Sequence, residues 1–168
     1  KYLDGGFKTP TKKMEFISER LLKYKDSHGY EGLPIYKPSE SSIEKTPEIA
    51  LEYPLIINTG SRLPMFVHSR TFRLSWTNNL RPDPMADISN EDAISYGIKQ
   101  GDTIRIVTPK DAITLKANIS PMIMKVVVSI YHAYKDADVN LLLDAYYTVP
   151  ISGFPGFKGF LGCRHGGF

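Results

Sequence analysis

Residues 53–70, YPLIINTGSRLPMFVHSR, join a short apolar run to a turn that carries hydrogen-bonding side chains. The β-branched segment Leu55–Asn58 predicts a buried strand. The glycine after it leaves room for backbone N–H groups to approach a phosphate, and the neighbouring hydroxyl and guanidinium groups add donors that suit phosphate oxygens. On these residues alone, a hairpin turn with a solvated arginine is the simpler interpretation. The turn consists of Thr59, Gly60, Ser61 and Arg62.

A second polar group follows the apolar segment LPMFV, and it consists of His68, Ser69 and Arg70. A histidine beside apolar residues is more often a hydrogen-bonded structural residue than a catalytic base. No acid lies near His68 in the sequence to orient its ring, and no nucleophile motif accompanies it, so the pattern argues against a hydrolytic triad. Donation of a hydrogen bond to a phosphate or a polar heterocycle would suit this histidine.

Positive charge is concentrated in two stretches of the chain. Residues 53–82 contain four arginines and no lysine, aspartate or glutamate, and residues 145–168 contain one lysine, one arginine and no acid. The whole chain has a formal net charge of only +3. The basicity is therefore local, which indicates an anion-binding site rather than a general attraction to polyanions.

The closing stretch PISGFPGFKGFLGCRHGGF, residues 150–168, contains six glycines and four phenylalanines. Its pattern predicts neither a helix nor a strand. A free linker would not normally carry so many aromatic side chains, so we expect this tail to pack. Its glycines, together with Lys158, could fold over an anionic ligand, and a tightly packed coil is the alternative interpretation.

Short strands separated by turns dominate the chain after residue 52. Strands are predicted at Leu55–Asn58, Thr103–Val107, Ala112–Ile119 and Val126–Ile130, of which the second and third form a β-hairpin. A short helix is expected between the first two strands, with Ser89 as its N-cap, Asp92 in the capping-box position and Gly97 at its end. This pattern favours a mainly β barrel over a parallel α/β sheet.

The first fifty or so residues differ from the rest. The spacing of Met14, Ile17, Leu21 and Tyr24 predicts a helix that stops near Gly29, although its start is also compatible with a short strand. The segment that follows is rich in proline and serine and predicts an extended linker. We therefore expect an arm and linker at 1–52 and a single barrel domain at 53–168.

Composition argues against several kinds of site. The single cysteine, Cys163, excludes an internal disulfide and a cysteine cage for a metal, and the four histidines lack metal-ligand spacing. No apolar run has the length of a membrane helix, so we expect no direct insertion into a membrane. The small number of basic groups argues against nucleic acid as a partner.

Four segments, in order, resemble the C-terminal cofactor-binding portion of the molybdopterin oxidoreductases, the dimethyl-sulfoxide-reductase superfamily. The TGSRLP and HSR motifs at 59–70 resemble the family's Thr-Gly-Arg and His-Ser/Thr signature. Residues 87–120 resemble its block of helix, turn, strand and hairpin, and residues 150–164 resemble its closing segment. GFKTPTKKMEF at 6–16 resembles the segment that precedes the linker. No single motif is specific, but the four occur in order over nearly the full length of the chain.

The resemblance implies a double-psi β-barrel, similar to the aspartate-decarboxylase-like fold, that binds a molybdopterin guanine dinucleotide carrying molybdenum or tungsten. It implies that Asn140 stands where the family has an asparagine that contacts the pterin. Ser61 is interposed between the glycine and the arginine of the family signature. The cofactor-binding residues that the resemblance implies are Thr59, Gly60, Ser61, Arg62, His68, Ser69, Arg70, Asn140, Phe157 and Lys158.

The metal ligand and the iron–sulfur cysteines of these enzymes lie in earlier domains, and one cysteine cannot hold a four-cysteine cluster. The resemblance therefore implies the cofactor-holding part of an oxidoreductase, without catalytic or metal-ligating residues of its own. Its partners would be the remaining domains of the parent enzyme and possible electron-transfer subunits, in the cytoplasm or periplasm of a prokaryote. Two alternatives stay open: a stand-alone double-psi barrel that binds a protein partner through a basic face, and a nucleic-acid binder.

Overall fold

The computed structural model describes residues 2–144, 148–149, 151–156 and 158–165. The chain divides into two compact units, residues 1–37 and residues 38–168. The first contains two short helices, α1 at Glu19–Leu22 and α2 at Lys25–His28. Gly29 ends α2 in a left-handed conformation with a φ of 63°, which glycine adopts without steric cost. The expected helix is thus present in two pieces, and Gly29 is its end.

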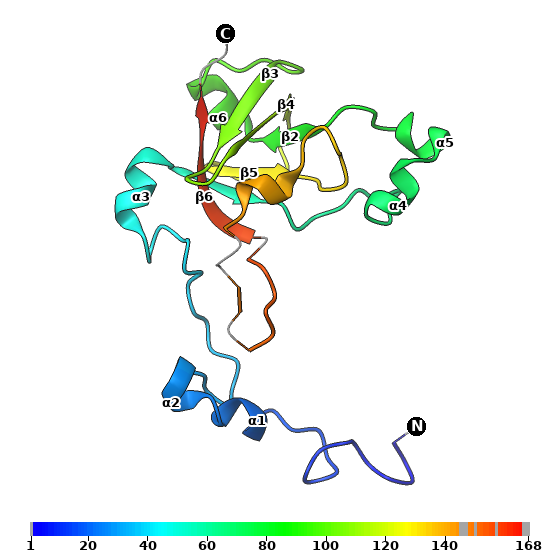
Figure 1. The fold of residues 1–168 in the computed structure, drawn as a ribbon, viewed down its shortest axis with the longest axis vertical. Coiled ribbons are helices and arrows are strands. Elements are labelled where there is room, and N and C mark those ends of the chain that lie inside the picture. Colours follow the sequence, from blue (N-terminus) through cyan, green and yellow to red (C-terminus); the bar gives the residue numbers. More distant parts are fainter. Residues whose placement is uncertain (1, 145–147, 150, 157, 166–168) are drawn as a thin grey trace. The chain divides into compact units, whose positions relative to one another are not determined.

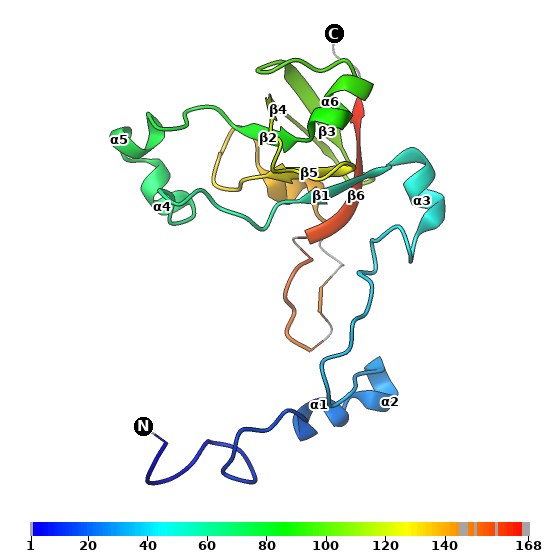
Figure 2. The same cartoon turned by 180° about the vertical axis from the view of Figure 1, so that it is seen from behind.

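The second unit is built around a closed barrel with the strand order β1-β5-β2-β4-β3-β6 (Figures 1 and 2). The pairs β1/β5 and β2/β4 are parallel, and the other neighbours are antiparallel. This architecture confirms the prediction of a mainly β barrel. The expectation of one or two short helices was too low, because the described residues of this unit contain more of them. The elements are α3 (Pro47–Glu52), β1 (Leu55–Asn58), α4 (Ser69–Phe72), α5 (Ser75–Asn78), β2 (Met85–Ile88), α6 (Asn90–Ser95), β3 (Thr103–Val107), β4 (Ala112–Ile119), β5 (Val127–Ile130), the 3-10 helix η1 (Val139–Leu142) and β6 (Lys158–His165).

The four predicted strands are present as β1, β3, β4 and β5, and β3 and β4 form the predicted hairpin. The prediction that the tail contains no strand is wrong, because β6 closes the barrel between β1 and β3. Its glycines lower the local preference for a strand, but one of them has a packing role. A Cβ at Gly162 would lie 2.7 Å from Ile57 Cγ1 and 2.9 Å from the Val107 carbonyl oxygen.

Several short elements were not anticipated from the sequence. Helix α3 occupies the end of the segment expected to be an extended linker, and β2 lies just before the predicted helix. Helices α4 and α5 interrupt the stretch between β1 and β2, and they lie at the end of an excursion away from the barrel (Figure 1). All of these elements have six residues or fewer, so their hydrophobic period is too short to be recognised.

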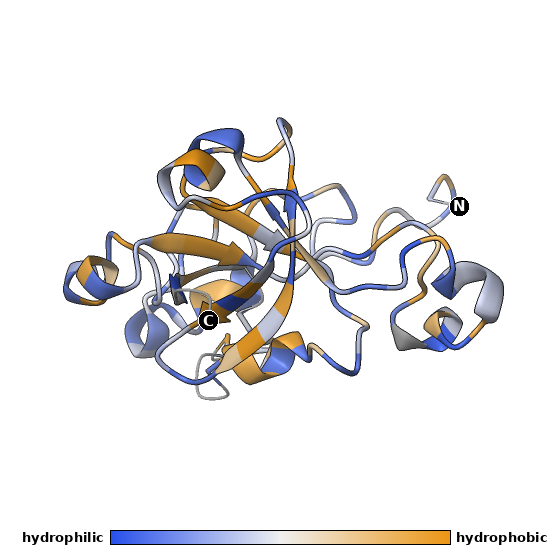
Figure 3. Ribbon diagram, turned by 90° about the horizontal axis from the view of Figure 1, so that it is seen from above, coloured by the Kyte–Doolittle hydropathy of each residue, from blue (hydrophilic) through white to orange (hydrophobic). Residues whose placement is uncertain are grey.

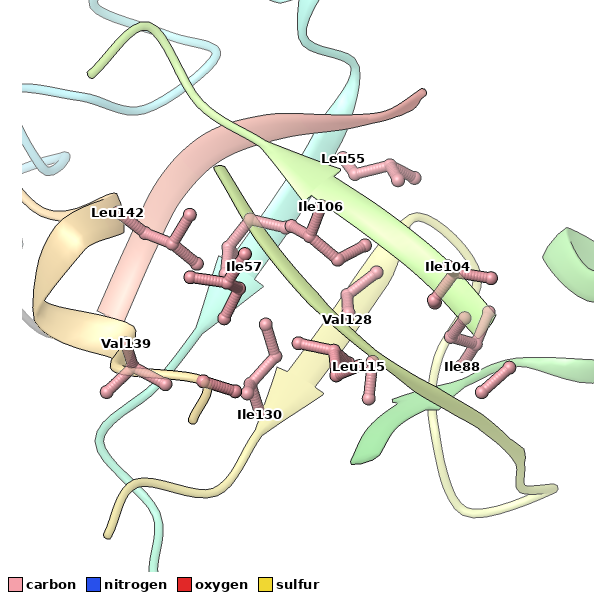
Figure 4. Packing of buried hydrophobic residues seen from close by; sticks show 14 of the residues in the cluster. Leu55, Ile57, Ile88, Ile104, Ile106, Leu115, Val128, Ile130, Val139 and Leu142 are labelled. Carbon is pink, nitrogen blue, oxygen red and sulfur yellow. The ribbon is translucent and has the colours of Figure 1, made fainter. Parts of the chain in front are cut away.

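Alternating apolar residues of the strands form one core inside the barrel. In β3 the isoleucines at 104 and 106 are buried, whereas Thr103 and Arg105 are exposed. Figure 3 shows that hydrophobic residues are concentrated on the strands of the barrel. Figure 4 shows side chains from β1, β3 and β5 meeting those of η1. Its labelled residues are Leu55, Ile57, Ile88, Ile104, Ile106, Leu115, Val128, Ile130, Val139 and Leu142.

The predicted capping residues begin helix α6 as expected. The buried hydroxyl of Ser89 accepts a hydrogen bond from Asp92 N–H at 3.0 Å and donates one to the Asp92 carboxylate at 2.8 Å. The same carboxylate accepts a 2.6 Å hydrogen bond from Val126 N–H, just before β5. The cap therefore provides an acceptor for a backbone N–H at the start of α6, and it also holds the chain that enters β5.

Candidate functional site

The site is built where two parallel neighbouring strands end. In β1 and β5, Asn58 lies beside Ser129 in register, so both strands deliver their following residues to the same edge of the barrel. The backbone N–H of His132 donates to the carbonyl of Ser61 at 3.4 Å, which ties the two exit loops together. The Asn58 side chain accepts a hydrogen bond from Gly60 N–H at 3.3 Å and shapes the first loop.

A cavity of about 520 Å³ lies between these loops, η1 and the segment before β6. A cavity of this size can enclose much of one small-molecule ligand. It combines two buried hydroxyls, two imidazoles, an ammonium, a carboxylate, a carboxamide and two aromatic rings. The lining residues are Thr59, Gly60, His68, His132, Ala133, Tyr134, Lys135, Asp138, Val139, Asn140 and Phe154.

The two histidines of the cavity interact directly. Nδ1 of His68 lies 2.9 Å from Nε2 of His132, within hydrogen-bonding distance, and the rings are stacked with their centroids 5.1 Å apart. The backbone beside this pair is strained, because His68 has a φ of 52° and Ala133 a φ of 106°. Positive φ values in residues other than glycine cost free energy and are frequent at ligand sites. The fold therefore holds this pair in place at an energetic cost.

Asn140 is held at the cavity by the start of η1. The Asp138 carboxylate oxygen Oδ1 accepts from the backbone N–H of Asn140 at 2.9 Å and from its side-chain amide at 2.8 Å. These two bonds fix the orientation of the carboxamide. An oriented amide can offer both a donor and an acceptor, which suits the edge of a nitrogen heterocycle.

A buried ion pair supports the loop after β5. The guanidinium of Arg81 donates to Asp87 of β2 at 3.0 Å, and the amide of Asn118 in β4 donates to the same oxygen at 2.8 Å. Arg81 also lies over the ring of Tyr131, 5.0 Å from its centroid, and its carbonyl accepts a 2.8 Å hydrogen bond from the Tyr134 hydroxyl. One of the four arginines of the acid-free stretch is thus neutralised within the fold.

Both tyrosines of this network have a raised pKa. Burial raises the pKa of Tyr131, and the nearby Asp87 carboxylate raises it further, whereas the Arg81 guanidinium opposes the increase. Burial is also the largest cause of the raised pKa of Tyr134, and Arg81 again opposes it. Both hydroxyls are therefore protonated at neutral pH, and that of Tyr134 acts as a hydrogen-bond donor.

The structure brings four of the residues named from the sequence to the cavity: Thr59, Gly60, His68 and Asn140. Ser61, Arg62 and Arg70 are not among its lining residues, and both arginine side chains are exposed. The side chains of Ser69 and Lys158 are not described, and Phe157 lies outside the described residues. The cofactor-binding roles of all ten residues stay predictions, including those of the four that line the cavity.

Sequence reasoning missed several residues of the cavity, which are His132, Ala133, Tyr134, Lys135, Asp138, Val139 and Phe154. His132 lies 64 residues from His68, so no local spacing signals the contact. Parallel pairing of β1 with β5 is what brings the two residues together. The only sequence signal was that both segments follow β-branched runs, which predicts strands but not their pairing.

Two further kinds of site are not found in the described part of the chain. Residues 2–144 and the shorter described segments after them contain no group of three or more side chains suited to a metal ion. Among the same residues, no helix has both the length and the apolar character needed to cross a bilayer. The cavity at the ends of β1 and β5, at about 520 Å³, is larger than a second cavity of about 100 Å³ beside Thr46 and Thr108, and it is the candidate site.

Sequence comparison gives consistent matches to one family. Residues 55–161 match the family model described as "Molydopterin dinucleotide binding domain". The chain is 32% identical over 160 residues to the dopamine dehydroxylase of Eggerthella lenta, covering 88% of this chain and 16% of that protein. It is 34% identical over 131 residues to a tetrathionate reductase polypeptide of Archaeoglobus fulgidus, covering 68% of this chain and 11% of that protein.

Structural comparison shows that a solved structure contains the fold of this chain. Acetylene hydratase from Pelobacter acetylenicus matches with a TM-score of 0.80 over 96% of this chain and 24% of that chain, at 23% identity. The chain therefore spans less than a quarter of the length of these relatives.

Proposed function

Since this chain belongs to the molybdopterin dinucleotide binding domain family, we propose that its cavity holds part of a molybdopterin guanine dinucleotide in a larger molybdenum or tungsten oxidoreductase. One observation carries the proposal. Four residues named from the family resemblance lie on the same cavity, although they come from segments up to 81 residues apart, from Thr59 to Asn140. The family match covers both segments.

The donors of the cavity fit the chemical groups of such a dinucleotide. The backbone around Gly60 can approach a phosphate closely, and Lys135 offers an ammonium to the same kind of group. The amide of Asn140 suits the hydrogen-bonding edge of a pterin, and the ring of Phe154 provides an apolar surface. Thr59 and Gly60 would hold phosphate oxygens, and Asn140 would orient the pterin.

The bound metal and pterin would supply the redox or oxygen-atom-transfer chemistry of the whole enzyme. This chain's own part is to bind the dinucleotide, orient it and offset its negative charge. Arg62, Arg70 and Lys158 lie on segments adjoining the cavity, and we propose that they add positive charge along the remainder of the dinucleotide.

We further propose that the barrel is of the double-psi type, which the two parallel pairs β1/β5 and β2/β4 support. We propose that the cofactor-binding domain proper begins near residue 53, because the family match begins at residue 55, although the compact unit that contains the barrel begins at residue 38. The parent enzyme would contribute the metal ligand and any iron–sulfur cluster from its other domains, with electron-transfer subunits as possible partners. The small share of each relative that this chain covers supports such additional domains.

Replacement of Asn140 with alanine in the full-length enzyme tests the proposal. We expect a several-fold loss of molybdenum or tungsten and of releasable guanine nucleotide per protein, because the pterin loses its oriented amide. Arg62→Ala is expected to lower the same two quantities. Asn90→Ala, which changes an exposed asparagine of α6 away from the cavity, is the matched control and should retain full cofactor content. Normal cofactor content in both site variants would overturn the proposal.

A further inference from the structure

The contact between His68 and His132 limits how many protons the two rings can hold. Their nitrogens are 2.9 Å apart, so one must carry a proton and the other must accept it. If both rings were doubly protonated, both of these nitrogens would be donors and the hydrogen bond would be lost. An intact pair therefore exists in two charge states, neutral or with one added proton.

The two charge states differ in what the outer ring nitrogens can do, and both histidines line the cavity. In the neutral pair, one outer ring nitrogen is a donor and the other is an acceptor, whichever ring donates within the pair. In the singly protonated pair, both outer nitrogens are donors and the pair carries one positive charge. Only the protonated state is matched to a ligand that offers acceptor oxygens and negative charge.

We propose that His68 and His132 act as one anion-binding unit that takes up a proton when a phosphodiester or diphosphate diester binds in the cavity. This inference rests on the proposed function and adds a proton to the binding reaction. Histidine is suited to this role because its charge changes close to neutral pH. The anion stabilises the protonated pair, and by linkage protonation strengthens binding of the anion.

Other charged groups around the pair favour the same ligand. Lys135 lines the cavity from the loop after β5 with an ammonium that also lies 3.9 Å from the exposed Asp136 carboxylate, and Arg70 lies two residues after His68. Asp138 is the one acid among the lining residues, and its Oδ1 already accepts two N–H groups from Asn140. The Tyr134 hydroxyl is directed to the Arg81 carbonyl. Among the lining residues, the histidine pair is therefore the group that can change the number of N–H donors it offers to a ligand.

Calorimetry on the full-length protein prepared without its cofactor tests the inference. The probe is guanosine diphosphate mannose, whose disubstituted diphosphate keeps a constant charge near neutral pH. Titrations at pH 7.5 in buffers of different ionisation enthalpy report the protons taken up on binding. We expect an uptake approaching one proton per site for the wild-type protein.

The variants His68→Asn and His132→Gln each keep a neutral hydrogen-bonding group near the contact but remove the shared titration. Both are expected to lose most of the proton uptake and to bind the probe about tenfold more weakly, as for the loss of one charge-assisted hydrogen bond. His28→Gln changes an exposed histidine of α2 outside the cavity and is the matched control. Far-UV circular dichroism and the melting temperature of each variant confirm folding.

The outcomes separate this inference from the proposed function. Binding of the probe to wild-type protein without proton uptake, or equal uptake in all three variants, would overturn the inference and leave the proposed function intact. Absence of binding would also overturn it, since no anion is then recognised. The proposed function is judged separately, by the cofactor content of the Asn140 variant.

Discussion

The ion pair between Arg81 and Asp87 allows a quantitative prediction about what stabilises the loop after β5. The Asp87 side chain is 8% exposed and that of Arg81 is 18% exposed. Asp87→Ala would leave this largely buried guanidinium without its carboxylate partner and would also remove the acceptor of the Asn118 amide. Removal of one partner from a buried pair typically costs about 3–5 kcal/mol.

We expect Asp87→Ala to lower the free energy of unfolding by about 3 kcal/mol, near the low end of that range because Arg81 retains some contact with water. The pair Lys116–Asp83 provides a matched control. Its nitrogen–oxygen distance is shorter, 2.7 Å against 3.0 Å, but its side chains are 45% and 43% exposed. Asp83→Ala should therefore cost only about 0–1 kcal/mol.

Urea denaturation of the 168-residue chain, followed by circular dichroism, measures both free energies. The double variant Arg81→Met/Asp87→Ala should be more stable than Asp87→Ala alone, because it contains no unpaired buried charge. A loss for Asp87→Ala no larger than that for Asp83→Ala would refute the reasoning, since burial would then not determine the contribution of the pair.

Two other features of the barrel lead to predictions. Gly162→Ala should lower the free energy of unfolding by about 1–3 kcal/mol in the same urea assay, because its methyl group would lie 2.9 Å from a backbone carbonyl oxygen of β3. Gly5→Ala, with no atom within 4 Å of the added carbon, should have little effect, and equal costs would contradict the steric argument. Stability should also fall at alkaline pH, because the pKa values of Tyr131 and Tyr134 are raised in the folded state. The stabilisation from their protonated forms is complete below the ordinary tyrosine pKa of about 10 and is lost as the pH rises through the folded-state values. Melting temperatures from pH 8 to 11 should decline less steeply in Tyr131→Phe than in the wild-type protein. The same slope in both proteins would show that ionisation of Tyr131 does not cause the alkaline loss of stability.

Some features of the fold could be predicted because they depend on neighbouring residues alone. The N-cap of α6 is local, since Ser89 and Asp92 lie three residues apart and satisfy each other. The β3–β4 hairpin is also local, because alternation and a tight turn specify both strands and their pairing. Strand β6 was missed because its glycines have a low intrinsic preference for strands, and pairing with β1 and β3 stabilises it.

By itself the sequence determined the mainly β class, four of the six strands that the structure describes, the capped helix and, through family motifs, four residues of the cavity. Tertiary structure alone decided which loops meet. Parallel pairing of β1 with β5 places His132 against His68, and the fold pairs Arg81 internally with Asp87. The physical reason is that spacing along the chain specifies periodic structure and caps, whereas contacts between distant segments depend on which strands pair when the barrel closes.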